Sequence, residues 1–104
     1  PYHASIAAAK GGVEGLALSL AAEFASQNIR VNVVAPSLTD TSLAGNLLNT
    51  AEERESSAMR PPFGRIGKPE DIASAISFLL SDESGWISGQ VLGIDGGMGN
   101  LKTL

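Results

Sequence analysis

Apolar residues in the first quarter of the chain follow helical spacing. From about Ser5 to Gln27 they recur every three or four residues, at Ile6, Val13, Leu16, Ala17, Leu20 and Phe24. Small residues follow the same spacing on another face, at Ala8, Gly12, Gly15, Ser19 and Ala22. Because a glycine inside a helix costs about 1 kcal/mol relative to alanine, we expect this small face to pack closely against another element; tolerated surface is the alternative.

A strand follows, from Ile29 to Ala35, and Pro36 stops it. Val31, Val33 and Val34 put apolar side chains on both faces of this strand. The absence of a polar face predicts a buried strand of a parallel sheet. The next segment, Ser37 to Gly67, mixes a helical stretch around Leu43 to Met59 with turn residues, and it closes in the loop "RPPFGRIGKP".

A further helix is predicted from Pro69 to about Leu80, since proline is accepted in a first turn and Glu70 and Asp71 suit a helix N-terminus. Its predicted buried stripe consists of Ile72, Ala75, Ile76, Leu79 and Leu80. A last strand is predicted from Val91 to Asp95, with Asp95 as a turn residue before "GGMGN".

A strand, a long helical crossover and a second strand are typical of a parallel α/β sheet. Two strands alone do not make a stable parallel sheet, so we expect partner strands from an absent N-terminal part or from another chain. The chain also begins with Pro1 inside what looks like a structural element. We therefore expect it to be a fragment of a longer protein.

Composition excludes several classes of function. The net charge is −4, from 7 Lys and Arg against 11 Asp and Glu, which argues against nucleic acid and anionic membranes as partners. The chain has no cysteine and one histidine, so we expect neither a disulfide framework nor a metal site. No apolar run approaches a membrane span, and these features together favour a cytoplasmic protein.

The string "AAAKGGVEGLALSLAAEFASQNIRVNVVAPS", with "GRIGKPEDIASAISFLLSDESGWISGQVLGIDGG" at the expected distance after it, resembles the C-terminal half of a short-chain dehydrogenase/reductase. The resemblance runs from about Ile6 to Gly97. It implies a doubly wound Rossmann-type domain that binds NAD or NADP, with residues 1–104 as its C-terminal half and the N-terminal half absent. The family's catalytic helix carries Tyr-x-x-x-Lys, in which tyrosine transfers a proton and lysine holds the nicotinamide ribose.

Lys10 is at the lysine position of that motif, but the tyrosine position is Ile6, which has no proton to exchange. Tyr2 lies eight residues before Lys10, about 12 Å along a helix, and cannot simply replace the missing phenol. His3 lies seven residues before Lys10, nearly on the same face, and an imidazole titrates near neutrality. A partly exposed histidine and a packing aromatic are the simpler interpretations of His3 and Tyr2, so the proton donor stays unassigned.

A second site signal is "PSLTDTSL", which resembles the family's Pro-Gly-x-x-x-Thr stretch. Pro36 and Thr41 match it, and Ser37 stands in place of glycine. The resemblance implies that Ser37, Leu38 and Thr41 flank the nicotinamide at the carboxyl end of the strand. A Cβ at position 37 would narrow the approach of the cofactor.

We therefore expect part of an NAD(P)-dependent oxidoreductase acting on a small alcohol or carbonyl substrate, inactive as this fragment. Within this half, Lys10 would be the catalytic residue, and it would bind the cofactor together with Ser37, Leu38 and Thr41. The family's subunit contacts and the small face of the first helix imply a homo-oligomer. The alternative is a non-catalytic relative, a nucleotide-binding or structural and assembly protein that kept the fold and lost the tyrosine.

Overall fold

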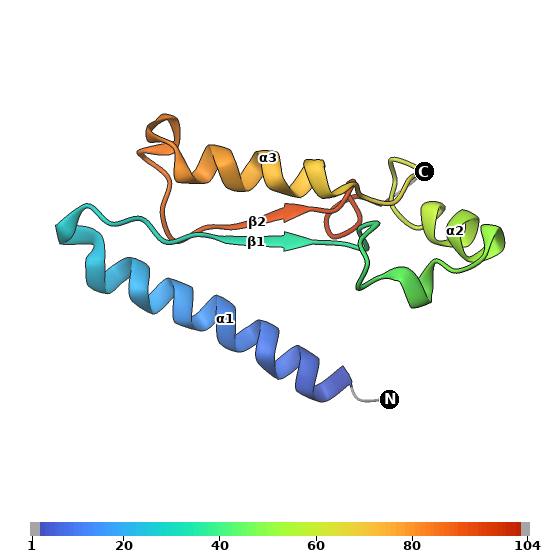
Figure 1. Ribbon diagram of the computed structural model, residues 1–104. Helices are drawn as coiled ribbons and strands as arrows, with labels where there is room; N and C mark the ends of the chain where they lie inside the picture. The colour runs from blue at the N-terminus through green and yellow to red at the C-terminus, as the bar shows by residue number, and fades with distance from the viewer. Residues whose placement is uncertain (1–2, 103–104) are drawn as a thin grey trace. The chain divides into compact units, whose positions relative to one another are not determined.

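The computed structural model describes residues 3–102, apart from the side chain at position 46. Within that range the chain forms three α-helices, three short 3₁₀ segments and two strands (Figure 1). Its residues divide into two compact units, one of Pro1–Val33 with Leu79–Leu92 and the other of Val34–Phe78 with Gly93–Leu104. We call these unit 1 and unit 2. None of the described helices combines the length and apolar character needed to cross a bilayer.

Helix α1 (His3–Phe24) confirms the predicted first helix, although it begins two residues earlier. Its last turn continues as a 3₁₀ helix, η1 (Ala25–Gln27), and Asn28 ends it in the left-handed conformation (φ 59°). The predicted apolar stripe is buried only in part. Of its members Ala17 is buried, whereas three larger ones are more than half exposed: Ile6, Val13 and Leu16. Ala21, which was not assigned to the stripe, is also buried.

The small face of α1 is open in this chain. A Cβ added at Gly11, Gly12 or Gly15 would meet nothing within 4 Å. The close approach that unit 1 does contain is at another position, where a Cβ on Gly89 (φ +71°) would lie 3.8 Å from the Cβ of Ala21. The other residues of unit 1 therefore cover only part of the apolar surface of α1, and the larger apolar side chains of the helix stay exposed.

Strands β1 (Val33–Pro36) and β2 (Val91–Ile94) pair in parallel, as predicted, and lie side by side in Figure 1. The predicted start of the first strand at Ile29 was wrong. The amide of Val31 donates to the hydroxyl of Ser88 (3.2 Å), and the side chain of Asn32 bonds to residues 87 and 90. Together with one backbone bond, from the amide of Gly89 to the carbonyl of Val31 (2.8 Å), these side-chain hydrogen bonds connect the two segments before the strand begins at Val33. β1 is half-buried rather than buried, and its last residue, Pro36, is exposed.

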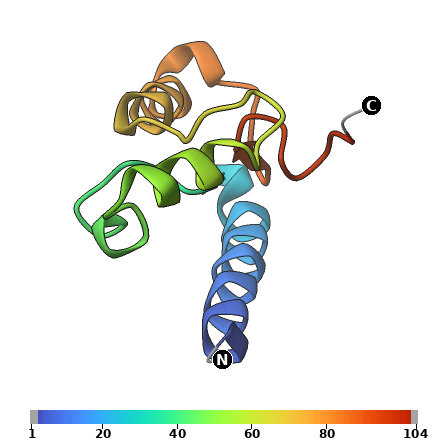
Figure 2. The same ribbon diagram turned by 90° about the vertical axis from the view of Figure 1, so that its right-hand side faces the viewer.

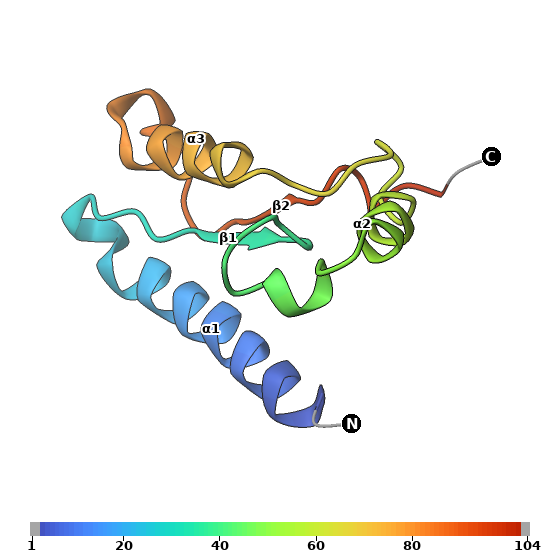
Figure 3. The same cartoon turned by 45° about the vertical axis from the view of Figure 1, so that its right-hand side comes forward.

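Helix α3 (Pro69–Leu80) matches its predicted bounds, and its residues in unit 2 lie beside the unit 2 ends of the two strands (Figures 1 and 3). The predicted burial of its stripe was wrong. No residue of α3 is fully buried; Ile76 is 42% exposed and Leu80, the last residue of the helix, is 80% exposed. Four-residue strands are too short to cover the whole apolar face of a twelve-residue helix.

Between β1 and α3 the predicted helical stretch is divided into two pieces, η2 (Gly45–Leu47) and α2 (Ala51–Ala58), drawn in green in Figure 2. The division occurs because Thr50 is extended and caps α2. Its hydroxyl accepts from the amide of Glu53, and the Glu53 carboxylate accepts from the amide of Thr50. The buried apolar side chains among the described residues of unit 2 are Ala44 and Leu48, just before this cap, and Pro61, after α2.

Candidate active site

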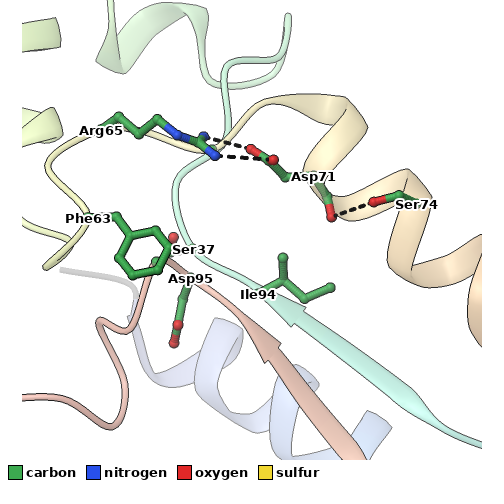
Figure 4. Close-up of a pocket in the computed structure, with 9 residues that line it drawn as sticks. Ser37, Phe63, Arg65, Asp71, Ser74, Ile94 and Asp95 are labelled. Carbon is green, nitrogen blue, oxygen red and sulfur yellow. Dashed lines mark hydrogen bonds and ion pairs between the residues drawn. The ribbon is translucent and has the colours of Figure 1, made fainter.

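A pocket of about 210 Å³ lies in unit 2 where β1 and β2 end. Ser37 follows β1 and Asp95 follows β2, so the pocket is at the carboxyl ends of parallel strands, where open α/β sheets bind ligands. Figure 4 shows how its walls come from both strand ends, from α3 and from the segment before that helix. The lining residues are Ser37, Phe63, Arg65, Gly67, Asp71, Ser74, Ile94, Asp95 and Gly96.

Ser37 fits this strand end without backbone strain. Its amide donates to the carbonyl of Ile94 (3.3 Å), and its own carbonyl accepts from the hydroxyl of Thr39 (2.9 Å). Among the described non-glycine residues, Asn28 is the one with positive φ, so position 37 does not require glycine. The serine that departs from the family motif is therefore accommodated, and it adds a Cβ and a hydroxyl to the pocket wall.

The residues after Ser37 keep free hydrogen-bonding groups. The carbonyl of Leu38 accepts from the amide of Gly67 (3.0 Å), but the Leu38 amide bonds to no residue of the described range. The hydroxyl oxygen of Thr41 accepts weakly from the amide of Ala44 (3.3 Å), which leaves its proton free to be donated. Ser37, Leu38 and Thr41 are thus brought together by one continuous segment of unit 2.

Two of the three charged side chains that line the pocket, Arg65 and Asp71, are paired with each other. Arg65 binds Asp71 through both terminal nitrogens, Nη1 to Oδ2 at 2.7 Å and Nη2 to Oδ1 at 3.2 Å (Figure 4). The amide of Lys68 also donates to this carboxylate (2.8 Å). These bonds, the one from Arg65 first, lower the pKa of Asp71 from 3.8 to about 2. The pair therefore builds the wall and offers no free charge to a ligand.

Sequence reasoning missed this ion pair, although Asp71 was assigned to the start of the helix. The sequence does signal the bond from the Lys68 amide, because an aspartate three residues after Lys68 is in the position from which a carboxylate caps a helix, but it carries no signal for the pairing with Arg65. Asp95 behaves as the predicted turn residue. Its two carboxylate oxygens accept from the amides of Gly97 and Gly99, each at 2.9 Å.

Lys10, the other predicted site residue, lies on α1 in unit 1 and is exposed. Its ammonium has no hydrogen bond or ion pair with the described range of the chain, so all three donors are available to a ligand. Ile6 lies one turn earlier on the same helix and is 52% exposed. His3 is the first residue of α1 and is also exposed, whereas Tyr2 lies outside the described residues.

The described residues contain no cluster of three or more histidine, cysteine, aspartate or glutamate side chains that could hold a metal ion.

In sequence, residues 1–99 match the family described as enoyl-(acyl carrier protein) reductase. The chain belongs to the short-chain dehydrogenase/reductase family.

Two relatives within the short-chain dehydrogenase/reductase family illustrate how much of the chain is shared. The 3-oxoacyl-[acyl-carrier-protein] reductase FabG of Thermotoga maritima is 48% identical over 98 residues, which are 94% of this chain and 39% of that protein. A tropinone reductase homolog of Arabidopsis thaliana is 46% identical over 90 residues, or 86% of this chain and 34% of that protein. The chain thus spans less than two fifths of the length of either relative.

Solved structures give the same result. A putative 2-deoxy-D-gluconate 3-dehydrogenase of Agrobacterium tumefaciens with bound NADP is 41% identical, with a TM-score of 0.81 over 88% of this chain and 37% of that one. A putative gluconate dehydrogenase of the same organism is 32% identical, with a TM-score of 0.84 over 91% of this chain and 38% of that one. The α/β architecture of the chain is therefore part of the Rossmann-type fold of these dehydrogenases.

Proposed function

We propose that the chain is part of an NAD(P)-dependent oxidoreductase that acts on a small alcohol or carbonyl substrate. The observation that carries the proposal is the family membership of residues 1–99, with a relative at 48% identity named as a reductase and a similar structure that holds NADP. The 104 residues would be the C-terminal half of one dinucleotide-binding domain, which agrees with the 39% of the relative that they span.

The free donors of the candidate site suit a nicotinamide cofactor. The exposed ammonium of Lys10 would hold the hydroxyls of the nicotinamide ribose, as the family's lysine does. The amide of Leu38 and the hydroxyl of Thr41 would meet the nicotinamide carboxamide, with Ser37 beside them. When bound, NADH or NADPH would supply the hydride for reduction of a carbonyl, and NAD+ or NADP+ would accept the hydride for oxidation of an alcohol. The residues of this chain bind and orient, and none of these roles needs a tyrosine.

Proton transfer is the step that the chain does not complete in the family's usual way. A carbonyl oxygen that becomes an alcohol must receive a proton, and Ile6 has none to give. His3, two helical turns before Lys10 on α1, is the described residue whose imidazole could serve. Without such a donor the chain would bind the cofactor and turn over slowly or not at all, and we expect the 104 residues alone to be inactive.

The second candidate is a non-catalytic relative that binds a nucleotide or supports an assembly. One observation favours it, the isoleucine at the tyrosine position, one turn from Lys10 on α1.

We further propose a cytoplasmic homo-oligomer. The open glycine face of α1 and the exposed edge residues Val91 and Leu92 support association, since neither is covered within this chain.

Fluorescence titration of the full-length protein with NADH and NADPH tests the proposal. We expect binding of at least one cofactor, about tenfold or more weaker binding in Lys10→Ala, and unchanged binding in the control Lys102→Ala, whose lysine lies near the end of the chain. Ketone reduction should then appear or rise in Ile6→Tyr. Cofactor binding without activity in either protein would support the non-catalytic candidate. If neither cofactor binds, both the oxidoreductase and the nucleotide-binding relative are excluded.

A further inference from the structure

A second hollow in unit 2, a groove of about 570 Å³, lies between α2 and the residues that follow β1. Its apolar side chains are Leu38 and Leu47, and its polar side comes from α2 and the residues after it. The polar lining residues are Glu52, Glu53, Ser56, Ser57 and Arg60. Leu38 directly follows Ser37, so the groove begins beside residues 37–41, the segment proposed to contact the nicotinamide.

The wall that contains Leu38 is held in place by backbone hydrogen bonds. Thr39 and Gly67 form a parallel bridge, in which the Gly67 amide donates to the carbonyl of Leu38 (3.0 Å) and the Asp40 amide donates to the carbonyl of Gly67 (2.9 Å). A Cβ on Gly67 would lie 3.2 Å from the hydroxyl of Thr39, so the two segments are also closely packed. Residues 38–40 are therefore a fixed base.

Helix α2, the opposite wall, has few anchors of its own. None of its residues is buried. The buried Leu48 (2% exposed) anchors the chain two residues before the Thr50 cap. Past that cap, the interaction that ties α2 to the base is the ion pair between Arg54 Nη1 and Asp40 Oδ2, 3.1 Å apart. Asp40 is two residues after Leu38, so this pair joins the same two walls that enclose the groove.

We propose that Arg54 and Asp40 are positioning residues that set the width of this groove, and that the groove holds the distal part of the substrate. The substrate class follows from the lining. Two leucines suit an apolar stem, and two serines suit hydroxyl or amide groups. Two carboxylates against one guanidinium disfavour an anionic tail. The ligand is therefore a ketone or alcohol with an uncharged, partly polar tail. This assignment rests on the proposed oxidoreductase function.

Hydrogen exchange of the full-length protein tests the positioning role without any activity. Both side chains of the pair are about half exposed (49% and 46%), so a modest effect is expected. Asp40→Asn and Arg54→Gln should each raise amide exchange in residues 51–58 about two- to fivefold at low salt. The double variant should exceed neither single one, and high salt should raise wild-type exchange toward theirs. Unchanged exchange in both single variants would overturn the proposal.

Glu55→Gln is the matched control, because Glu55 is the neighbour of Arg54 on α2, carries a charge and does not line the groove. Exchange in residues 51–58 should stay within twofold of wild type in this variant. An increase equal to that of Arg54→Gln would assign the effect to the general charge of α2 rather than to the ion pair, and would also overturn the proposal.

Steady-state kinetics test the substrate assignment, with a ketone carrying an uncharged hydroxylated tail and its truncated analogue. In the full-length protein, or in Ile6→Tyr where that variant supplies the turnover, Arg54→Gln should raise KM for the long ketone about threefold or more. Its kcat, and both constants for the truncated ketone, should be unchanged. Equal effects on both ketones, or none, would refute the groove assignment. A wild type that binds neither NADH nor NADPH would instead refute the proposed function and the substrate assignment with it, and hydrogen exchange would still decide the positioning role.

Discussion

The guanidinium of Arg30 donates a 2.9 Å hydrogen bond to the carbonyl of Leu79, in the last turn of α3. It also donates to the carbonyls of Ser81 (3.1 Å) and Ile87 (3.3 Å). The last carbonyls of a helix have no partner within the helix, and a cation there complements the helix dipole. One side chain before β1 thus fastens the end of α3 and the loop that leads to β2, which keeps the two strands in register.

Replacing Arg30 should therefore destabilise the fold strongly for a residue that is not in the apolar core. Arg30→Gln should lower the free energy of unfolding by about 2 to 3 kcal/mol, because up to three carbonyls lose a charged donor. Arg30→Lys should lose less, since a point charge remains but the planar fork is lost. Urea denaturation at constant slope measures both. Arg60→Gln, at an exposed arginine, should stay within about 0.5 kcal/mol of wild type.

The sequence predicted the elements whose signals are local. Helix α3 was predicted to the residue because Pro69, the two acidic residues after it and the apolar spacing all agree. The predicted start of β1 was four residues too early. Arg30 and Asn32 lie within a β-branched run, but their side chains form hydrogen bonds with residues 79–90 instead of extending the strand. Such long-range bonds leave no mark in local periodicity.

The candidate site divides in the same way. Ser37, Leu38 and Thr41 were assigned to the cofactor site because a short motif carries them, and this role stays a prediction. In the structure they follow β1 on one segment, and Ser37 lines the pocket. The pairing of Arg65 with Asp71 and of Arg54 with Asp40 escaped prediction. Partners 6 and 14 residues apart across turns have no fixed spacing, so neither pair can be recognised before the fold is known.

Because the pKa of Asp71 is low in the folded protein, the contribution of its ion pair with Arg65 to folding stability depends on pH. Because folding lowers this pKa from 3.8 to about 2, the pair stabilises the fold above pH 4, and that stabilisation is lost as the pH falls through 2. Carboxyl carbon NMR should show Asp71 titrating near 2 in the wild type, and its pKa should rise toward 3.8 in Arg65→Gln without reaching it, because the Lys68 amide still donates to the carboxylate. The stability difference between wild type and Asp71→Asn should shrink as the pH falls from 4 to 2. A difference independent of pH over that range would contradict this assignment.

Two glycines should respond oppositely to alanine. Gly97 has φ +88°, and a Cβ there would lie 2.6 Å from Cδ1 of Leu101, so Gly97→Ala should cost about 1 to 3 kcal/mol. Gly15 lies inside α1 with open space around it in this chain, so Gly15→Ala should stabilise the dissociated protein by about 1 kcal/mol. At protein concentrations low enough to dissociate the proposed homo-oligomer, the urea midpoints of the two variants should therefore move in opposite directions. A lower midpoint for Gly15→Ala under these conditions would mean that another part of the same protein covers the small face of α1.

Sedimentation of the same Gly15→Ala variant tests the proposed homo-oligomer. If the open face of α1 meets a second copy of the chain, a methyl group at position 15 would separate the two surfaces, because close packing tolerates little added volume. The variant should then dissociate at a protein concentration about tenfold higher than the wild type does. Glu14→Ala, an exposed neighbour on the same helix, is the control and should assemble normally. Equal assembly of all three proteins would exclude this face from the contact.

The cap at Thr50 should control the stability of α2 more than any apolar contact, because α2 buries no residue and its first turn relies on the exchange of bonds between Thr50 and Glu53. Thr50→Val removes the hydroxyl that accepts the Glu53 amide at nearly constant volume. Since such caps contribute about 1 kcal/mol, amide exchange in residues 51–58 should rise about fivefold. Thr50→Ser retains the hydroxyl and should behave as wild type. If both variants exchange alike, the packing of Leu48 and the ion pair between Arg54 and Asp40, rather than the cap, hold α2 in place.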